Sequence, residues 1–534
     1  MTPVLPSAVI TEIYPVDSWV DISAYVVSDI VGSFGFASDT PDDRVAGNNY
    51  LALTLNNVGK QFSPFGAETL IGWRKGVRIR VSVVYRSIQY VVWAGRIWDI
   101  EMDSGPHGPR RVRINARDWL STFGMSPLPP LTTGIDQRAN EGIADVLAVM
   151  PVQPYATDFD AGIDVFPTTH DAISGRSPAV RELNNLVMSE YGYLYPRRDR
   201  IAAETLRFES RNARDARSIP ASIPVPGDES SYLITEAGDF ITTEDGDFIV
   251  LDEVEAVGFD NSATGMTVKY GEKIYNDVTF ICHPRRVDPD IAVLAATRER
   301  VYLAAGESTT IRLGYVDPVA GGSTISATGL LTPVSGTDYE MTANRDGTGT
   351  DYTADLTVTP DYGGNYVEYT LENTGGNDGY VYIQARGYGI YFYDPISIRV
   401  YDEDSIIANG LGEIMIDQRY QPYADVSGPL AEIVLNRYNE PVSVPNMITM
   451  IANKDERRMY AFLYLDTGEL VPVVDDQTNV DGSYFIHGGN FSITVGGIIT
   501  TNYHLKDALT LSDAYWLLET VGASELGETT IIGV

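Results

Sequence analysis

Hydrophobic and polar residues alternate along much of the first 120 residues, as they do in strands with one buried face. Residues 77–83 (Val-Arg-Ile-Arg-Val-Ser-Val) and 111–116 (Arg-Val-Arg-Ile-Asn-Ala) both have a period of two. Shorter β-like runs occupy residues 19–22, 50–55 and 90–94. The pattern predicts a small antiparallel barrel-like or sandwich domain over residues 1–120.

The next segment changes to helical spacing and predicts an α+β domain over residues 121–217. Within residues 138–150, Ile143, Val146, Leu147 and Met150 fall on one helix face. A second helix is predicted from Ser177, as its cap, and Pro178 to Gly192. A hairpin should follow, formed by residues 193–195 and 206–209.

The remaining chain is mostly strand and turn, with one helix predicted at about 428–438. Residues 233–240 and 241–248 are a short repeat, each with a strand-like half and a Glu-Xaa-Gly-Asp turn. A short helical run is also predicted near Ser512–Glu519. The predicted divisions are a linker with short repeat hairpins and a second β segment at 218–295, a β-sandwich-like insertion at 296–385, an α+β segment at 386–480, and a C-terminal β/helical tail at 481–534.

Length and composition support a multidomain, mainly β protein with α+β segments. The chain has 534 residues, 49 Gly, 29 Pro and 33 Tyr, which suits many turns and half-buried pleated surfaces. No apolar run approaches the roughly 20 residues that span a bilayer, and the N-terminus lacks the pattern of a secretory signal. We therefore expect no membrane span and synthesis in the cytoplasm.

The net charge of −35 is concentrated in the last three-fifths of the chain. Residues 1–120 hold 12 basic and 12 acidic residues, residues 121–217 hold 10 and 13, and residues 218–534 hold 16 and 48. A surface this acidic repels phosphate backbones, so the C-terminal part is not expected to grip nucleic acid.

The sequence offers little catalytic chemistry. A single cysteine, Cys282, excludes an intrachain disulfide and multi-cysteine metal sites. The five histidines show no zinc-binding spacing, and no nucleotide-binding loop or hydrolase elbow is present. We expect no catalytic residue, metal or cofactor. The histidines are His107, His170, His283, His487 and His504.

Four weaker patterns have a structural and a functional interpretation. Adjacent strand residues point to opposite faces, so Cys282 is more simply a core thiol than the partner of His283. Residues 344–351 (Asn-Arg-Asp-Gly-Thr-Gly-Thr-Asp) resemble a calcium loop only faintly, and a turn held by Asn and Asp side chains is the simpler reading. Paired carboxylates could serve a glycosidase, but 73 acidic residues make chance pairs common.

The basic residues of the first domain are expected to pair with an acidic neighbouring subunit rather than with nucleic acid. These are Arg74, Lys75, Arg78, Arg80, Arg110, Arg111, Arg113 and Arg117.

Five segments, in order, resemble one family. They are Trp19-Val-Asp-Ile-Ser23, Leu53–Pro64 with its Asn-rich and Phe-Ser-Pro parts, Gly76-Val-Arg-Ile79, Trp93-Ala-Gly-Arg-Ile97 and Val112–Asp118. This order is similar to that of tail-tip hub and minor tail proteins of long-tailed, siphovirus-type bacteriophages, which are themselves similar to baseplate hub proteins. Segments within 189–211, 275–278 and 404–406 agree with it.

The resemblance implies a structural virion protein at the tail tip, made in the host bacterial cytoplasm. It implies a homotrimer whose paired barrel-like domains form a pseudo-sixfold ring that continues the tail tube. The expected partners are the distal tail protein, the tape-measure protein and tail-fibre proteins, with DNA passing through the channel without specific binding. Contact with the host cell surface is a further expectation.

Two alternatives remain open at this point. The chain could be a receptor- or carbohydrate-binding virion protein that uses the 296–385 insertion, or a glycan hydrolase of the tail tip. For the hub, we further predict that Trp19, Trp93 and Trp98 anchor the first domain. We also predict an acidic or uncharged bore, with Arg78, Arg80, Arg111 and Arg113 turned toward neighbouring subunits.

Overall fold

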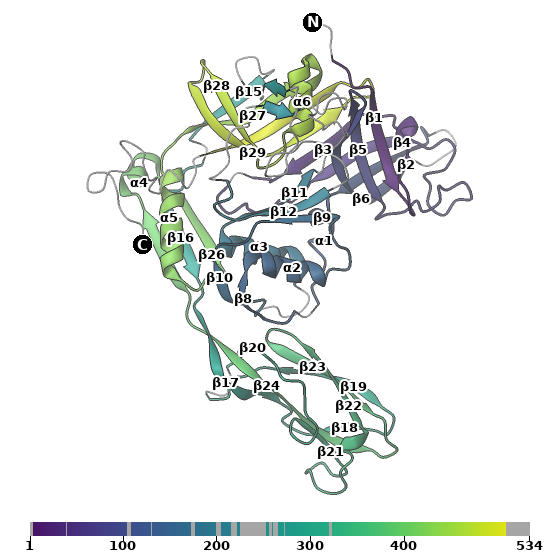
Figure 1. Ribbon diagram of the computed structural model, residues 1–534, viewed down its shortest axis with the longest axis vertical. Helices are drawn as coiled ribbons and strands as arrows, with labels where there is room; N and C mark the ends of the chain where they lie inside the picture. The colour runs from purple at the N-terminus through teal and green to yellow at the C-terminus, as the bar shows by residue number, and fades with distance from the viewer. Residues whose placement is uncertain are drawn as a thin grey trace, which may run out of the picture.

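The protein is mainly β and folds into several sheets, as the pattern predicts (Figure 1). A computed structural model describes residues 4–38, 40–47, 49–103, 108–129, 131–171, 177–198, 204–214, 222–224, 253–255, 259, 265–271, 273–319 and 323–508. The predicted repeat at 233–248, the helical run near Ser512–Glu519 and His107 lie outside these residues.

The N-terminal strands form half of one large antiparallel sheet. They are β1 (Ala8–Tyr14), β2 (Val20–Asp21), β3 (Ile30–Gly35), β4 (Tyr50–Asn56), β5 (Arg78–Tyr85), β6 (Ile88–Met102) and β7 (Arg111–Arg117). On β7, Val112, Ile114 and Ala116 are buried and the basic residues between them are exposed. The period-two prediction is therefore confirmed in this half of the sheet.

The other half of the sheet comes mainly from the C-terminal part of the chain. Its strands are β15 (Gly265–Tyr270), β27 (Ser443–Ile451), β28 (Leu470–Asp475), β29 (Val480–Ile493) and β30 (Ile499–Asp507). The two halves join where β29 pairs with β3. Gly35 has a positive φ of 85° there, and a Cβ on it would lie 2.3 Å from the Cα of Gly488. Only glycine allows this close approach.

The sheet has 12 strands in the order β15-β27-β30-β29-β3-β4-β7-β6-β5-β1-β2, with β28 paired to β29. Within the described residues this path does not close on itself, so the sheet is open and the expected barrel-like domain is not a closed barrel. One core serves both halves, and α6 (Glu456–Tyr464) packs into it with Met459, Tyr460 and Phe462.

Only one of the three predicted tryptophan anchors is fully buried. Trp93 is 3% exposed, whereas Trp19 and Trp98 are half-buried. The ring of Trp19 lies under Arg80, and that of Trp98 lies near Lys75 and Arg117. The charged ends of arginine and lysine side chains therefore lie against two rings that were predicted to be in the core.

The predicted α+β segment forms a layer beside the large sheet. Its elements are α1 (Trp119–Phe123), β8 (Gly134–Arg138), α2 (Ala139–Ala148), β9 (Ala156–Phe159), β10 (Val165–Thr169), α3 (Ala179–Glu190), β11 (Tyr193–Arg198) and β12 (Glu204–Glu209). Both predicted helices and the β11–β12 hairpin are confirmed. Ser177 does not cap α3, because Pro178 is the N-cap and no side-chain cap bond is made.

A three-stranded sheet and α5 form the next unit. The strands are β16 (Asp277–Cys282), β25 (Ile396–Tyr401) and β26 (Glu413–Gln418), with α4 (Glu403–Asn409) beside them. The helix α5 (Ala424–Tyr438) packs Leu430 and Val434 against β16. It begins before the predicted position, because Pro429 lies inside the helix rather than at its start.

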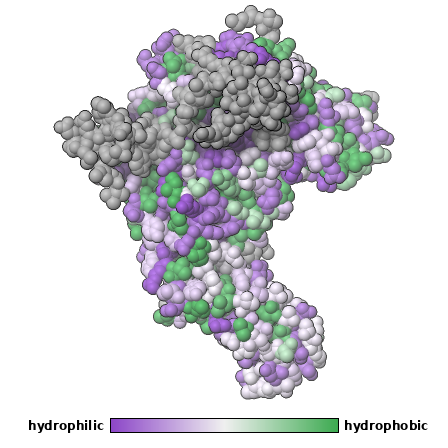
Figure 2. All heavy atoms as spheres, in the orientation of Figure 1, coloured by the Kyte–Doolittle hydropathy of each residue, from purple (hydrophilic) through white to green (hydrophobic). Residues whose placement is uncertain are grey.

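The predicted β-sandwich projects from the body on a neck formed by β17 and β24 (Figure 1). Two sheets enclose one core that contains Tyr315, Val367, Tyr369 and Ile383. Figure 2 shows mostly residues of intermediate hydropathy on this face of the sandwich, with scattered hydrophilic and hydrophobic ones. The strands are β17 (Arg285–Ala296), β18 (Val301–Leu303), β19 (Ser308–Gly314), β20 (Ser326–Thr328), β21 (Tyr339–Thr342), β22 (Leu356–Tyr362), β23 (Tyr366–Asn373) and β24 (Gly379–Phe392).

Two short strands, β13 (Ser222–Pro224) and β14 (Glu253–Glu255), pair with each other. Among the described helices, none is both long enough and apolar enough to cross a membrane.

Candidate functional site

Cys282 and His283 have different partners. The Cys282 side chain is buried, and its thiol lies 3.6 Å from the carbonyl oxygen of Ile396. His283 Nε2 lies 2.5 Å from Asp417 Oδ1 on the neighbouring strand. Burial raises the pKa of the Cys282 thiol, which disfavours the reactive thiolate.

Two other histidines are buried and hydrogen-bonded. His170 Nδ1 lies 2.8 Å from Glu182 Oε1, and the Tyr420 hydroxyl donates to the same oxygen at 2.6 Å. His487 Nε2 lies 2.5 Å from the carbonyl oxygen of Ser38. In the part of the chain that the structure describes, no group of three or more His, Cys, Asp or Glu residues is arranged to hold a metal ion.

The loop at 344–351 is held by its own side chains. The Asn344 amide donates to Thr348 Oγ1 at 3.0 Å, and Asp346 accepts from the Thr348 amide at 3.0 Å. Asp351 accepts from the Thr353 amide at 2.8 Å. These bonds are those of the predicted Asn- and Asp-stabilised turn.

Two arginines of the first domain form ion pairs within their own chain, and their expected pairing with a neighbouring subunit stays a prediction. Arg80 Nε lies 2.8 Å from Glu12 Oε2. Arg113 lies 3.2 Å from Glu101 and 3.1 Å from Asp103. Glu12 lies directly opposite Arg80 on the neighbouring strand, and Glu101 lies directly opposite Arg113.

One pair of carboxylates meets in a cavity. Asp118 caps α1 by accepting from the Ser121 amide at 2.6 Å, and Glu204 accepts from the Trp119 amide at 2.8 Å. Burial raises the pKa of both, and the neighbouring Asp118 raises that of Glu204 further. The cavity beside them has a volume of about 20 Å³, which holds one water and no sugar ring.

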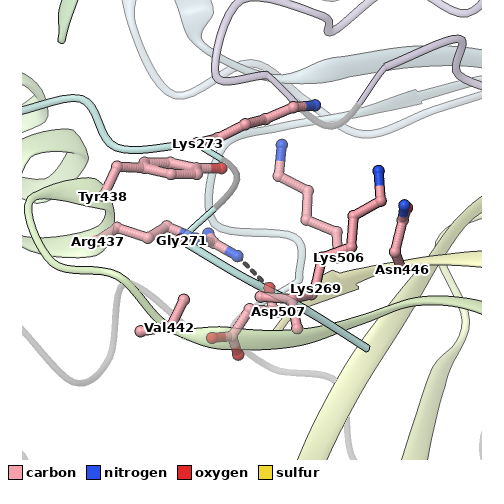
Figure 3. A pocket seen from close by; sticks show the side chains of 10 residues that line it. Lys269, Gly271, Lys273, Arg437, Tyr438, Val442, Asn446, Lys506 and Asp507 are labelled. Atoms are coloured by element: carbon pink, nitrogen blue, oxygen red, sulfur yellow. Dashed lines mark hydrogen bonds between the residues drawn. The ribbon is translucent and has the colours of Figure 1, made fainter. Parts of the chain in front are cut away.

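The cavity in Figure 3 is lined by basic residues from distant parts of the chain. Lys269 lies on β15, Lys506 and Asp507 on β30, Arg437 on α5, and Lys273 after β15. We call this cavity the inner pocket. Figure 3 shows the ammonium groups of the three lysines on one side of it, while the Asp507 carboxylate points away from them.

A larger cavity adjoins the inner pocket, and Lys269, Lys273 and Asn446 line both. We call the two together the basic cleft. The inner pocket has a volume of 60 Å³ and the outer one 450 Å³. Polar side chains from β3, β27, β29 and β30 line the outer part: Ser33, Asn446, His487, Asn490 and His504.

Behind the inner pocket lies a buried group of cations around Tyr193. Arg214 and Arg44 lie 3.7 and 4.5 Å from its ring centre, and Lys506 Nζ lies 5.8 Å from it. Burial, together with the cations Arg44, Arg437 and Arg214, lowers the pKa of Lys506 to about 7. Burial alone would raise the pKa of Tyr193, but the surrounding cations outweigh it and lower this pKa to about 6.

The loop between β4 and β5 holds its shape by internal bonds and exposes apolar side chains. The Asn57 amide donates to Ser63 Oγ at 2.8 Å, and Trp73 Nε1 donates to the carbonyl oxygen of the fully buried Phe62 at 2.9 Å. The same loop leaves Val58, Phe65 and Ile71 exposed by 56, 105 and 80%. It contains the Phe-Ser-Pro segment of the family resemblance.

The solvent face of β24 carries a row of aromatic and polar residues. The ring of Tyr302 on β18 is 51% exposed and lies 5.5 Å from that of Tyr380. The Tyr302 hydroxyl donates to Asp378 at 2.7 Å, and Arg386 pairs with Asp338. The half-buried residues of this row are Tyr380, Tyr382, Gln384, Arg386 and Tyr388.

Sequence reasoning missed the basic cleft and the β24 row. Lys269, Arg437 and Lys506 stand far apart in a strongly acidic region, so no local pattern marks them. The alternation along β24 (Tyr380, Tyr382, Gln384, Arg386, Tyr388) is visible in the sequence and could have indicated an aromatic outer face.

No protein-family model and no curated protein matches the chain. Solved structures with a similar fold include a 43 kDa tail protein of prophage MuSo2 from Shewanella oneidensis, with 9% identity over 94% of this chain and 99% of that one and a TM-score of 0.46. A tail protein from Neisseria meningitidis MC58 has 11% identity over 94% and 97%, with a TM-score of 0.43. Prophage tail protein gp18 from Listeria monocytogenes EGD-e has 8% identity over 95% and 97%, with a TM-score of 0.37. All three of these structural neighbours are tail proteins.

Proposed function

We propose that this chain is a non-enzymatic structural protein of a phage particle that forms the hub of the tail tip as a closed homotrimer. The distal tail protein, the tape-measure protein and tail fibres are its proposed partners, and DNA passes through its channel without specific binding. The observation that carries the proposal is the β4–β5 loop with its exposed Phe65.

The loop has the properties of an interface element. Its internal bonds fix the backbone before contact, so little conformational entropy is lost on binding. Burying one phenylalanine side chain contributes roughly 1.5–3 kcal/mol, and a ring of copies repeats that contribution at each contact. We propose that Phe65 and Ile71 insert into the neighbouring copy.

The test is assembly of a Phe65→Asp variant. The side chain is fully exposed, so the free energy of unfolding of the isolated chain should change by less than about 0.5 kcal/mol. Incorporation into purified tails should nevertheless fall strongly. Val319→Asp is the matched control, because Val319 is 91% exposed on the sandwich. Equal incorporation of both variants would contradict the role of the loop.

The β24 row favours a second candidate function, binding of a host-surface glycan by the sandwich. Exposed tyrosine rings stack on sugar faces, and neighbouring acid, amide and guanidinium groups bond to hydroxyls. Binding of the particle's host polysaccharide should be lost in a Tyr302→Ala/Tyr380→Ala double variant and kept in Val319→Ala. Unchanged binding in the double variant would eliminate this candidate.

A further inference from the structure

The basic cleft concentrates positive charge in the most acidic part of the chain. Residues 218–534 contain 16 basic residues against 48 acidic ones. Four of those basic residues, Lys269, Lys273, Arg437 and Lys506, line the single inner pocket. At about 0.15 M salt, charges more than roughly 8 Å away are largely screened. The local potential in the cleft is therefore set by the charged groups that line it, four cations and the Asp507 carboxylate in the inner pocket.

Lys506 is the main indication that the cleft binds a ligand. Its side chain is 4% exposed, and its ammonium group has no hydrogen-bond acceptor among the residues that the structure describes. A buried ammonium without a hydrogen-bond acceptor is costly, and the attraction of the nearby Tyr193 does not outweigh the burial and the neighbouring cations that lower the pKa of Lys506. Figure 3 shows Lys506 extending beside Lys269 toward the side of the pocket where Lys273 lies.

The neighbouring arginines increase the free-energy cost of burying the charged Lys506 side chain. Arg44 and Arg214 are each 6% exposed and already have acceptors in the carbonyl oxygen of Tyr191, at 2.7 Å, and Glu209, at 2.8 Å. Arg437 donates to the carbonyl oxygen of Asp507. An incoming anion would thus meet an ammonium group without an acceptor, beside arginines that each already donate to an oxygen.

The dimensions of the cleft favour a ligand with one carboxylate in the inner pocket and an extended peptide in the outer part. An inner volume of 60 Å³ holds a small anionic group, and the adjoining 450 Å³ holds several residues in an extended form. The amides of Asn446 and Asn490 can bond to a peptide backbone there. A DNA duplex is far wider than the inner pocket, and the acidic surroundings would repel its phosphates.

We propose that the basic cleft binds an extended, carboxylate-bearing segment of a partner protein, with one carboxylate in the inner pocket against Lys506. The proposal does not depend on the tail-hub assignment. It assigns a binding site to residues of β15, β30 and α5 that carry no role in the proposed assembly.

Binding should strengthen as the pH falls from 8 to 6. Lys506, with a pKa of about 7, gains its charge over this range, while Tyr193 loses its negative charge as the pH approaches its pKa of about 6. The other charged groups that face Lys506 or line the cleft are Arg44, Arg214, Arg437, Lys269, Lys273, Asp43 and Asp507. His487 stays neutral because burial and the nearby Lys506 keep its pKa well below 6.5.

The test measures binding of a fluorescein-labelled hexaglutamate peptide to the full chain at pH 6 and pH 8, at about 0.15 M salt. A hexaglutamine peptide is the uncharged control. Wild-type affinity for hexaglutamate should be about tenfold higher at pH 6, the change in the charged fraction of a group with a pKa near 7. Lys506→Met should weaken binding at pH 6 at least about tenfold and remove most of the pH dependence. Lys454→Met, at an exposed lysine, should leave both unchanged.

Misfolding can be separated from loss of the site. Lys506→Met removes a buried charge, so its melting temperature should equal or exceed that of the wild type. Equal affinity for the two peptides, or wild-type affinity in Lys506→Met, would overturn the proposal. Saturable binding of inorganic phosphate or duplex DNA without binding of hexaglutamate would also overturn it.

Discussion

The neck of the sandwich depends on a buried ion pair between Arg285 and Asp171. Arg285 begins β17, Asp171 follows β10, and both side chains are 0% exposed. Arg285 also donates to the carbonyl oxygen of Arg419, and Thr168 donates to Asp171 at 2.6 Å. The Arg285–Asp171 ion pair and its hydrogen bonds therefore link the α+β layer, the neck of the sandwich and Arg419, which follows β26.

Replacing Arg285 by Met should destabilise the protein by about 3–5 kcal/mol, because the Asp171 carboxylate would remain buried without its partner. Burial already raises the pKa of Asp171 despite the neighbouring Arg285, so desolvation is the larger effect at this site. An Asp171→Leu/Arg285→Met double variant should recover most of the loss, since two apolar side chains leave no unpaired charge.

The assay is urea denaturation followed by far-ultraviolet circular dichroism, with hydrogen exchange of β10 and β17 as a local measure. Arg345→Met is the control, because the Arg345–Glu299 pair is 65 and 73% exposed and should contribute at most about 1 kcal/mol. A loss below about 1 kcal/mol in Arg285→Met, or a double variant less stable than the single one, would refute the reasoning.

Three further predictions concern other buried groups of the protein. Trp93→Ala should lower the free energy of unfolding by about 3–5 kcal/mol in urea titrations. Trp98→Ala should lower it by clearly less, because of the two side chains only Trp93 is fully buried. Equal losses in the two variants would contradict this prediction. Gly35→Ala should lower the melting temperature and increase exchange in β3 and β29, whereas Gly47→Ala, where the added Cβ meets no atom within 4 Å, should not. Burial raises the pKa of Glu190 to about 7, so its contribution to stability is present below its unfolded pKa of about 4.5 and is lost as the pH rises through 7. The difference in unfolding free energy between wild type and Glu190→Gln should therefore fall from pH 4.5 to pH 8, and a constant difference would show this assignment to be wrong.

Local patterns predicted the local elements well. The alternation in β5 and β7, the stripe of Ile143, Val146 and Leu147 in α2, and the β11–β12 hairpin all depend on neighbours in sequence. The predicted start of α5 is wrong, because proline favours the first turn of a helix whereas Pro429 lies inside this one.

Long-range pairing could not be predicted in the same way. The β3–β29 contact joins strands more than 440 residues apart. The glycines at 35, 488 and 489 allow this close pairing, but nothing in the sequence indicates that they meet. The basic cleft has the same origin, because Lys269, Arg437 and Lys506 meet only after the sheet and α5 have packed together. The six predicted domains and the five boundaries between them stay predictions, as do the trimer and the charge of its bore.

The central claim, a structural role as the hub of a phage tail tip, is tested most directly by electron cryomicroscopy of assembled tails. Three copies in a closed ring at the tail tip, with Phe65 of each buried against the next and an open axial channel lined by acidic or uncharged residues, is the result that we expect. A chain present as single copies away from the tail axis, or a bore lined mainly by Arg78, Arg80, Arg111 and Arg113, would contradict the account.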